Sequence, residues 1–408
     1  MHTLLLTGPG GAGRTTMAAA TALAAARSGQ RVLVLSADPG DPLGSLLGTT
    51  APAAGQPTAP AEEVVPGLPA HPVAVDGDRN HRRLWTARID SGQDFRAELT
   101  ALQDRATAVL DFLGARPLGA EELTELPGAE QFALLRALRR SAAAGPAGFD
   151  LVVVDMPPLH QAVAALALPA QLRRYLARLV PAERQAARAL RPVLAQLVGV
   201  PMPAQWLYEA AERWDRELAA VQAVVESADT SVRLVAEPGP AAAEALRLGR
   251  LGLALHGLAA GPVLANRLVP AGSAEPWLAG LAAQQDKYTS QWPDHRPLPH
   301  LGRDPRGPED LALLDPGPVT APPRPHWPVE DRRAEDGVLV WTVPLPGAEK
   351  RELDLIRRGD DLLLTAGPHR RIVPLPSALR RCTVSGAALA DGVLRIRFTP
   401  DPGLWPTR

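Results

Sequence analysis

The sequence predicts an α/β protein with a mostly parallel sheet, an inserted helical subdomain and a small C-terminal all-β sandwich. Short apolar runs, each followed by glycine or acidic residues, recur through residues 1–314 and predict buried strands. Long helical patterns lie between these runs, as expected for strands joined by helical crossovers. After a proline-rich stretch the pattern changes to short β-like runs separated by glycine and proline.

The first 38 residues predict a strand–loop–helix–strand unit. Residues 4–6 are apolar and lead directly into a glycine-rich turn at residues 8–13. An alanine-rich helix is expected over residues 15–27, followed by a second buried strand at residues 31–35. This order predicts two parallel strands joined by a helix.

The rest of the first predicted domain, residues 1–314, alternates strands with helical blocks. Further strands are expected at 151–154, 232–235 and 262–265, and a helical subdomain at about 93–145 and 160–230. Residues 48–80 are rich in Ala, Pro and Gly and are interpreted as a surface excursion.

A second domain is predicted at residues 336–400, after a proline-rich linker at 315–335. Several of its apolar runs alternate with polar residues, most clearly at 393–398, which favours a small antiparallel sandwich. The expected strands are 337–343, 352–356, 361–365, 370–374 and 392–398.

The composition excludes several classes of function. The net charge is −1, so no overall positive field attracts nucleic acid. Cys382 is the single cysteine, which excludes an internal disulfide framework and a cysteine-rich zinc site. No apolar run reaches the ~20 residues of a membrane span. We therefore expect a cytoplasmic protein without a transmembrane segment or a nucleic-acid partner.

Residues 8–15, GPGGAGRT, fit the phosphate-loop pattern G-x-x-x-x-G-K-[ST] except that Arg14 replaces the lysine. Glycines allow backbone N–H groups to surround phosphate oxygens, and the following helix places its N-terminus beneath them. The Thr15 hydroxyl is a candidate Mg²⁺ ligand. The same loop also matches G-x-G-x-x-G, so a dinucleotide site or a turn without a ligand remain alternatives. The predicted nucleotide-binding residues are Gly10, Gly11, Ala12, Gly13, Arg14, Thr15 and Thr16.

Three polar residues follow the later strands. Asp155 ends an apolar strand, an arrangement that supports Mg²⁺ beside a phosphate loop; the alternative is a cap of the next segment. Asp38 follows the second strand, where a carboxylate is able to orient the water that attacks a γ-phosphate; the alternative is a turn residue. Asn266 follows the 262–265 strand and is either a partner for the base or a turn residue.

Taken in order, these motifs resemble the ArsA family of P-loop ATPases, which includes arsenite-pump ATPases and guided-entry ATPases for tail-anchored membrane proteins. The phosphate loop of that family is K-G-G-x-G-K-[ST]-T, its first switch D-P-A-H-[SN]-L, and its second switch D-T-A-P-T-G-H-T-L. The corresponding segments here are PGGAGRTT at 9–16, DPGDPL at 38–43 and DMPPLHQAV at 155–163. The family's L-P-G-x-E and V-N-R-x-x-P appear as LPGAE at 126–130 and ANRLVP at 265–270.

The resemblance implies binding of ATP or ADP with Mg²⁺, coupled to a conformational change in a dimer or a client. The ligands it implies are Thr15 and Asp155 for Mg²⁺, Asp38 for the attacking water and Asn266 for adenine. It also implies a homodimer, or a heterodimer with an intact ArsA-like paralogue, and a hydrophobic or membrane-protein client. Residues 337–399 resemble a small heat-shock (α-crystallin) domain, which suggests a chaperone role.

Departures from the family pattern predict an ATP hydrolase with weak or partner-assisted activity. Pro9 stands where a lysine reaches the partner's nucleotide, and Arg14 stands where a lysine contacts the β- and γ-phosphates. Asp41 replaces the histidine of the first switch. Two alternatives remain: a non-enzymatic scaffold or chaperone with a degenerate phosphate loop, and a Rossmann-type dinucleotide oxidoreductase.

Overall fold

The structure is a computed structural model that describes residues 1–405 apart from a few segments. The residues outside the description are 50–60, 79–81, 108–109, 112–113, 145–147, 181–202, 293 and 321, together with 406–408 and the side chains of 203–207.

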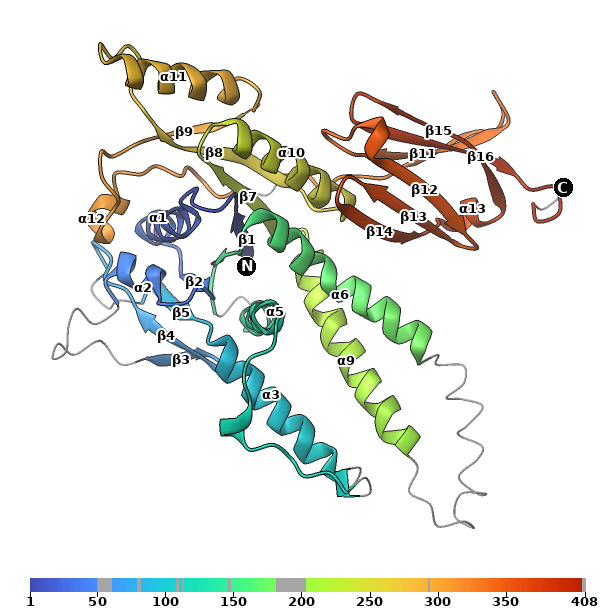
Figure 1. Ribbon diagram of the computed structural model, residues 1–408, viewed down its shortest axis with the longest axis horizontal. Coiled ribbons are helices and arrows are strands. Elements are labelled where there is room, and N and C mark those ends of the chain that lie inside the picture. Colours follow the sequence, from blue (N-terminus) through green and yellow to red (C-terminus); the bar gives the residue numbers. More distant parts are fainter. Residues whose placement is uncertain are drawn as a thin grey trace.

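A nine-stranded, mostly parallel sheet forms the centre of the first domain, in the order β3-β4-β5-β2-β6-β1-β7-β8-β9 (Figure 1). The predicted parallel sheet is therefore confirmed. Its parallel strands are β1 (His2–Thr7), β2 (Val32–Ser36), β5 (Leu84–Arg88), β6 (Leu151–Asp155), β7 (Thr230–Ala236), β8 (Ala260–Leu268) and β9 (Arg296–Pro299).

Two short strands, β3 (Glu62–Val65) and β4 (Leu68–Pro72), extend one edge of this sheet in antiparallel fashion. Both lie in the segment 48–80, which the composition predicts to be a surface excursion; that expectation is wrong for residues 62–72. Pairing of β4 with β5 holds the segment in the sheet, and such long-range pairing leaves little local signal in a sequence rich in Ala and Pro.

Helices cover both faces of the sheet, which explains why its central strands are buried along nearly their whole length and are mainly apolar. Along β1, Leu4 and Leu6 join one core and Leu5 the other. The first face is covered by α1 (Arg14–Arg27), α2 (Pro42–Leu47) and α12 (Gly307–Leu311). The second core includes α5 (Ala129–Ala143), α6 (Leu159–Leu179) and α10 (Pro240–Leu255), while α11 (Pro276–Thr289) follows β8.

The helical subdomain projects from the sheet and comprises α3 (Ser91–Arg105), the short 3-10 turn η1 (Ala120–Glu122), α5, α6 and α9 (Pro203–Val225) (Figure 1). An ion pair joins α6 to α9, with Arg173 Nε 2.9 Å from Asp215 Oδ1. The sequence predicts the helical subdomain at about 93–145 and 160–230. Within these ranges, residues 108–109, 112–113, 145 and 181–202 lie outside the described part. No helix among the described residues combines the length and the hydropathy that a membrane crossing requires.

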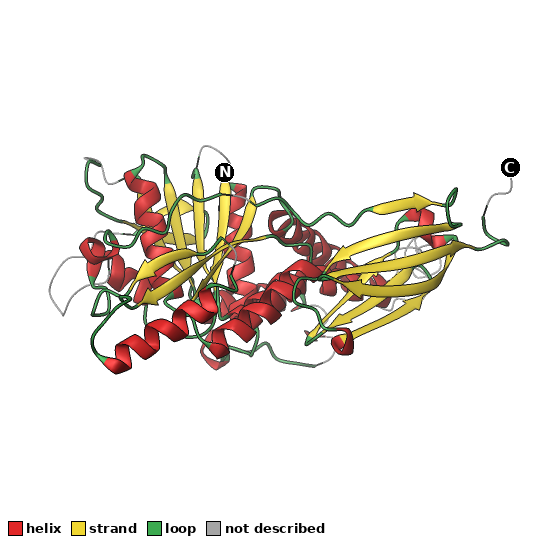
Figure 2. Ribbon diagram, turned by 90° about the horizontal axis from the view of Figure 1, so that it is seen from above, coloured by secondary structure: helices red, strands yellow, loops and turns green. Residues whose placement is uncertain are grey.

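The C-terminal domain is a sandwich of two antiparallel sheets (Figure 2). Its four-stranded sheet has the order β10-β11-β16-β15 and its three-stranded sheet the order β12-β13-β14. The elements are β10 (Val329–Arg332), β11 (Val338–Pro344), η2 (Lys350–Glu352), β12 (Leu353–Arg358), β13 (Asp361–Ala366), β14 (His369–Pro374), α13 (Ser377–Arg380), β15 (Cys382–Ala390) and β16 (Val393–Pro400).

Five of these strands follow the predicted apolar runs, and two do not. β10 lies inside the segment 315–335 that the prolines predict to be linker, and it pairs with β11. β15 is made largely of small residues and pairs with β16. Neither strand carries a strong apolar alternation, so its partner strand determines its conformation.

The chain between the two domains is fixed to the first. Arg233, buried on β7, donates to the carbonyl oxygens of Pro316 and Pro318. Arg324 donates to the carbonyl oxygens of Val225 and Ser227 at the end of α9. These contacts hold the proline-rich segment along the first domain, although its composition alone suggests a semi-rigid spacer.

Candidate nucleotide-binding site

The glycine-rich loop lies between the carboxyl end of β1 and the first turn of α1. Its glycines are required by geometry at two positions, Gly11 with φ +76° and Gly13 with φ +89°, both in the left-handed region. A Cβ on Gly10 or Gly11 would meet no atom within 4 Å, so open space lies over the loop at these residues. A Cβ on Gly8 would lie 1.9 Å from the carbonyl oxygen of Val235. The loop therefore packs closely against β7 and leaves room where a phosphate would sit.

The loop ends at the N-terminus of α1, where Gly13 is the N-cap and provides no side-chain cap. The first turn contains no acidic residue. A helix N-terminus of this kind attracts anions because its N–H groups lack intrahelical partners. Thr15 and Thr16 lie in this first turn, as predicted for a phosphate loop that continues into a helix.

Asp155 ends β6 beside the loop, and only 3% of its surface is exposed. Its Oδ2 accepts a hydrogen bond from Ser36 Oγ at 3.1 Å, whereas its buried Oδ1 has no partner. Burial raises the pKa of Asp155 to about 6. The Thr15 hydroxyl opposes this shift, and the nearby charge of Asp38 adds to it. A buried carboxylate oxygen without a partner is unusual and fits a site for a cation or its water.

Asp38 lies next to Asp155 because β2 and β6 are neighbours, with Ser36 opposite Asp155 in register. The Thr15 hydroxyl donates to Asp38 Oδ2 over 3.4 Å, and the backbone N–H of Asp38 donates to Ser36 Oγ. The structure therefore brings Thr15, Asp38 and Asp155 together from three separate segments, as the sequence motifs predict. Ser36, which contacts both carboxylate residues, was missed; a polar residue at the end of an apolar strand is the signal that marks it.

The residues present fit a Mg²⁺ ion in the manner of phosphate loops. Mg²⁺ takes few protein ligands and keeps waters and phosphate oxygens as the remainder. Among the described residues, no group of three or more His, Cys, Asp or Glu side chains forms a metal cage. Thr15 and Asp155 would hold the ion, directly or through water, beside bound phosphates.

Arg14 contacts the backbone of the segment that follows β6. Its Nη1 donates to the carbonyl oxygen of Met156, the residue that follows Asp155. The guanidinium therefore lies at the start of the segment that matches the second switch. One of its five N–H donors is directed at this carbonyl, which leaves the others for a phosphate.

The end of β8 supports the loop from its other side. Asn266 Nδ2 donates to the carbonyl oxygen of Ala12 at 2.9 Å, and Arg267 Nη1 donates to that of Gly11 at 3.2 Å. Arg267 also pairs with Glu237 at 3.4 Å. Asn266 thus uses its amide nitrogen to hold the loop, and its role toward a base stays a prediction. The bracing function of Arg267 was missed, because nothing in a linear motif shows a contact across 256 residues.

Two further acidic residues lie near the site. Asp41 is the N-cap of α2 and accepts from the backbone N–H of Gly44 at 3.0 Å, so its carboxylate stabilises a helix end. Glu130, in the first turn of α5, is half-buried near Asp38. Burial and then the charges of Asp38 and Glu125 raise the pKa of Glu130, while Arg14 opposes them. The segment 126–130 therefore approaches the phosphate loop from the helical subdomain.

A cavity of about 900 Å³ opens beside the loop. The loop residues Pro9 and Gly10 line it, as do His160 of α6 and Glu237 after β7. Pro9 places an apolar ring here, where the family pattern has a lysine. His369 of the C-terminal domain also reaches this cavity.

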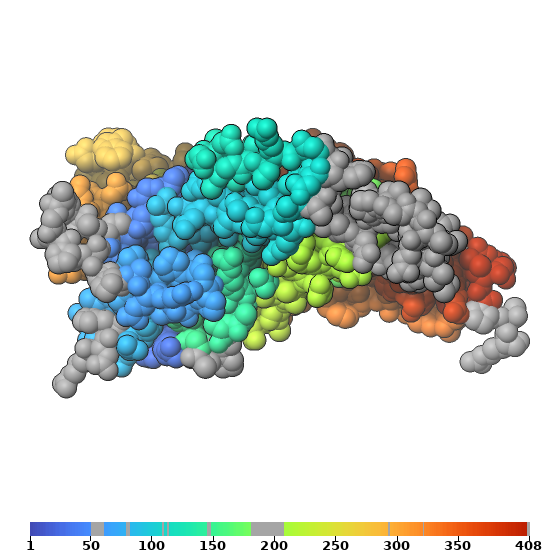
Figure 3. Space-filling model, turned by 90° about the horizontal axis from the view of Figure 1, so that it is seen from below, coloured from blue at the N-terminus to red at the C-terminus, as the bar shows by residue number. Residues whose placement is uncertain are grey.

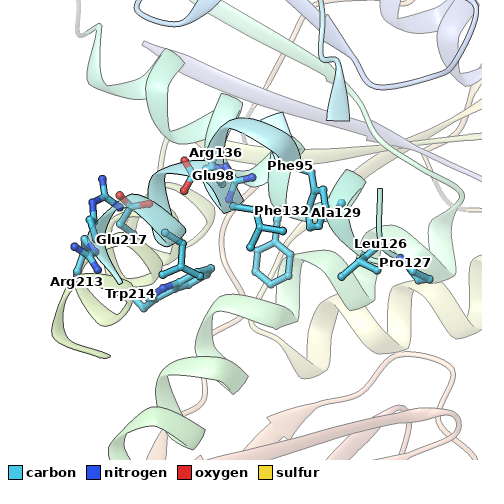
Figure 4. Close-up of a pocket in the computed structure, with 14 residues that line it drawn as sticks. Phe95, Glu98, Leu126, Pro127, Ala129, Phe132, Arg136, Arg213, Trp214 and Glu217 are labelled. Carbon is cyan, nitrogen blue, oxygen red and sulfur yellow. The ribbon is translucent and has the colours of Figure 1, made fainter. Parts of the chain in front are cut away.

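A second cavity, of about 330 Å³, lies within the helical subdomain between α3, α5 and α9 (Figure 4). α3 and α9 lie side by side on the surface of this region, in cyan and yellow-green (Figure 3). Phe132 and Trp214 meet edge to face, with ring centroids 6.2 Å apart. The other apolar lining residues include Phe95, Leu99, Leu102 and Leu126.

The comparisons with known proteins agree with this geometry. A model of the anion-transporting ATPase family (ArsA_ATPase) matches residues 1–295, and a model of the HSP20-like domain found in ArsA matches residues 336–398.

Three relatives cover nearly the whole chain. An uncharacterized protein of Streptomyces coelicolor is 57% identical over 100% of this chain and 99% of its own length. A protein of Mycobacterium tuberculosis is 33% identical over 99% of this chain and 97% of its own length. A protein of Aquifex aeolicus named "Putative arsenical pump-driving ATPase 1" is 24% identical over 93% of this chain and 95% of its own length. With its nine-stranded sheet and phosphate loop, this chain belongs to the ArsA family of anion-transporting ATPases and carries an HSP20-like domain at its C-terminal end.

Proposed function

We propose that this protein binds Mg-ATP or Mg-ADP at the loop 8–16 and couples binding to a conformational change of a dimer or a bound client. The observation that carries the proposal is the meeting of Thr15, Asp38 and Asp155 at one edge of the sheet, with an unpartnered buried oxygen on Asp155. The family match favours this function over a dinucleotide-dependent oxidoreductase.

Each residue has a separate role in the proposal. Backbone N–H groups of residues 10–13 and of the first turn of α1 surround the phosphates. Thr15 and Asp155 hold Mg²⁺, which neutralises phosphate charge when bound. Asp38 orients the attacking water, since it lies beside Thr15 and is less buried than Asp155.

Hydrolysis by the isolated protein is slow in this proposal. Pro9 supplies no charge, and Arg14 is bound to the Met156 carbonyl in the structure described here. Catalysis of phosphoryl transfer depends on positive groups placed at the transferring phosphate. A heterodimer with an intact ArsA-like paralogue would supply the missing lysine, whereas a homodimer would not.

The helical subdomain is the candidate client region. Its 330 Å³ cavity is lined mainly by aromatic and aliphatic side chains and lies next to the segment 126–130, which also approaches the phosphate loop. An apolar cavity of this kind suits a hydrophobic segment of a client protein.

Isothermal titration calorimetry with Mg-ATP and Mg-ADP tests the proposal. The intact protein should bind at least one nucleotide with micromolar affinity, and Asp155→Asn should remove the Mg²⁺ dependence of that binding. Arg27→Ala is the matched control, because Arg27 lies at the far end of α1 and pairs with Asp76 at the surface.

Turnover is then measured with and without an intact ArsA-like protein from the same organism. Stimulation supports the heterodimer. Binding without turnover under either condition favours the non-enzymatic scaffold, and a folded protein that binds no nucleotide at saturating concentration contradicts the proposal.

A further inference from the structure

The C-terminal domain is docked on α10 through specific polar contacts. Arg247 Nη1 lies 3.0 Å from Glu352 Oε2 and 2.7 Å from the carbonyl oxygen of Gly347. His369 Nε2, on β14, donates to the carbonyl oxygen of Leu248 over 2.9 Å. These contacts join α10 to three separate segments of the sandwich, so the domain is held in one orientation.

Apolar and ionic contacts extend this docking surface. Leu251 and Leu255 of α10 belong to the same buried cluster as the core of the sandwich. Arg371 Nη1 donates to the carbonyl oxygen of Leu255 at 2.7 Å. Arg174 of α6 pairs with Asp361 of β13 at 2.8 Å. The sandwich therefore contacts both α6 and α10.

Two glycines on α10 allow α6 and the sandwich to approach closely. A Cβ on Gly249 would lie 2.1 Å from the Leu159 side chain. A Cβ on Gly252 would lie 2.7 Å from the His369 ring and 2.8 Å from Val163. At these two glycines α10 is in close contact with α6 and with the sandwich. A shift of α6 must therefore displace α10 or its neighbours.

The start of α6 is in turn bonded to the phosphate loop. The backbone N–H of Leu159 donates to the carbonyl oxygen of Gly8 at 3.0 Å. Just before it, the Thr7 hydroxyl donates to the carbonyl oxygen of Pro157 at 2.8 Å. Contacts therefore continue from Gly8 to Leu159, across Gly249 and Gly252, and on to His369.

We propose that the HSP20-like domain responds to the nucleotide at the phosphate loop, with His369 as the positioning residue that links its docking to α6 and α10. The proposal rests on the proposed function, because it requires that nucleotide binds at residues 8–16. A ligand that moves Arg14 off the Met156 carbonyl changes the segment 155–159, where α6 begins. The close packing of α6 on α10 transmits that change to β14.

Thermodynamic reciprocity makes the proposal measurable. If nucleotide alters the docking, then weakening the docking must alter nucleotide affinity by the same factor. Coupling between distant sites is commonly 5- to 150-fold in affinity. The coupling is therefore measured in both directions.

The first measurement compares Mg-ATP and Mg-ADP affinities of the full-length protein with those of His369→Ala and Gly252→Ala. We expect each variant to change at least one affinity by about fivefold or more. His300→Ala is the matched control, since His300 is exposed in the first domain. Melting curves verify that each variant is folded, and Arg247→Gln replaces any that is not.

The second measurement is hydrogen–deuterium exchange of residues 369–374 with and without Mg-ATP. In the wild type, nucleotide should change exchange in β14, and in His369→Ala this difference should disappear.

Unchanged affinities in both variants together with nucleotide-independent exchange in β14 overturn the coupling but leave the proposed function intact. If the variants melt at lower temperatures but bind Mg-ATP and Mg-ADP as the wild type does, His369 has a purely structural role. That result also overturns the proposed coupling. Failure of the wild type to bind nucleotide overturns both proposals.

Discussion

The side-chain amide of Asn266 donates to the carbonyl oxygen of Ala12 over 2.9 Å and so connects the end of β8 to a loop 254 residues earlier in the chain. The same amide nitrogen would lie 2.4 Å from a Cβ on Gly13. The shape of the phosphate loop therefore depends on a distant strand as well as on its own glycines.

Gly13→Ala should disturb the loop more than its backbone strain alone predicts. Its φ of +89° makes any side chain unfavourable by about 1–2 kcal/mol, and the new methyl group would also displace Asn266. We expect a loss of stability in chemical unfolding and weaker Mg-ATP binding. Gly29→Ala is the matched control, because Gly29 has φ +98° but no atom within 4 Å of its Cβ position. Equal effects of the two variants would argue against a role for Asn266 in shaping the loop.

Arg14→Ala should weaken Mg-ATP binding by about ten- to a hundredfold, the range expected for a charge-assisted hydrogen bond. The reason is that Arg14 occupies the motif position whose side chain contacts the β- and γ-phosphates. Calorimetry on the wild type and the variant checks this result. Unchanged affinity would mean that Arg14 stays on the Met156 carbonyl when nucleotide is bound.

Asp38→Asn should preserve nucleotide affinity and lower any turnover by about a hundredfold or more, because an amide cannot accept a proton from the attacking water. Phosphate release measured at saturating Mg-ATP checks the turnover, and calorimetry checks the affinity. A parallel loss of binding and turnover would instead place Asp38 among the Mg²⁺ or phosphate ligands.

The double variant Pro9→Lys with Arg14→Lys should raise turnover if the two missing ammonium groups limit hydrolysis. A compact ammonium reaches phosphate oxygens where a planar guanidinium does not fit. The measurement is the steady-state rate of phosphate release in the presence and absence of a partner subunit. No gain, with nucleotide binding retained, would locate the defect in the switch segments, where Asp41 caps α2.

The stability of the protein should fall with decreasing pH because of His256 at the end of α10. Burial lowers the pKa of His256 to about 3, and the positive charge of Arg371 adds to the shift, with a smaller contribution from His369. The stabilisation is complete above the unfolded pKa of about 6.5 and is lost as pH falls toward 3. By pH 5 the contribution of His256 has fallen by about 2 kcal/mol. The raised pKa of Asp155 has the opposite sign and offsets part of this loss over the same range.

Urea unfolding at pH 7.5, 6 and 5 measures this dependence. His256→Gln should flatten the curve over this range, while the exposed variant His300→Gln should follow the wild type. The same pH dependence in the wild type and in His256→Gln would contradict the expectation.

Much of the first domain follows from local sequence. The apolar runs at 4–6, 32–35 and 151–154 predict strands because both faces of a parallel sheet are buried, so the middle of each strand has no polar position. Glycines at 11 and 13 predict the loop because only glycine adopts their positive φ at low cost. Asp38 and Asp155 are predictable as partners of that loop, since the carboxyl ends of parallel strands meet at one edge.

Other features are decided by tertiary contacts. β4 and β15 have weak strand signals and depend on their pairing with β5 and β16. The motif at 265–270 predicts Asn266 as a site residue, but its contact with the Ala12 carbonyl is seen only in the folded chain. The contacts of Ser36 with Asp155 and of Arg267 with Gly11 likewise join separate segments, and no linear spacing shows them. The position of Arg14 on the Met156 carbonyl is likewise a property of the packed structure.

The sequence by itself determined the phosphate loop, the parallel strands around it and the change to a β domain, because backbone conformation and burial pattern are local properties of neighbouring residues. Only the tertiary structure decided that Arg14 lies on the second switch, that β8 supports the loop, and that His369 reaches α10. These contacts depend on the distance between segments far apart in the chain, and no local periodicity encodes that distance.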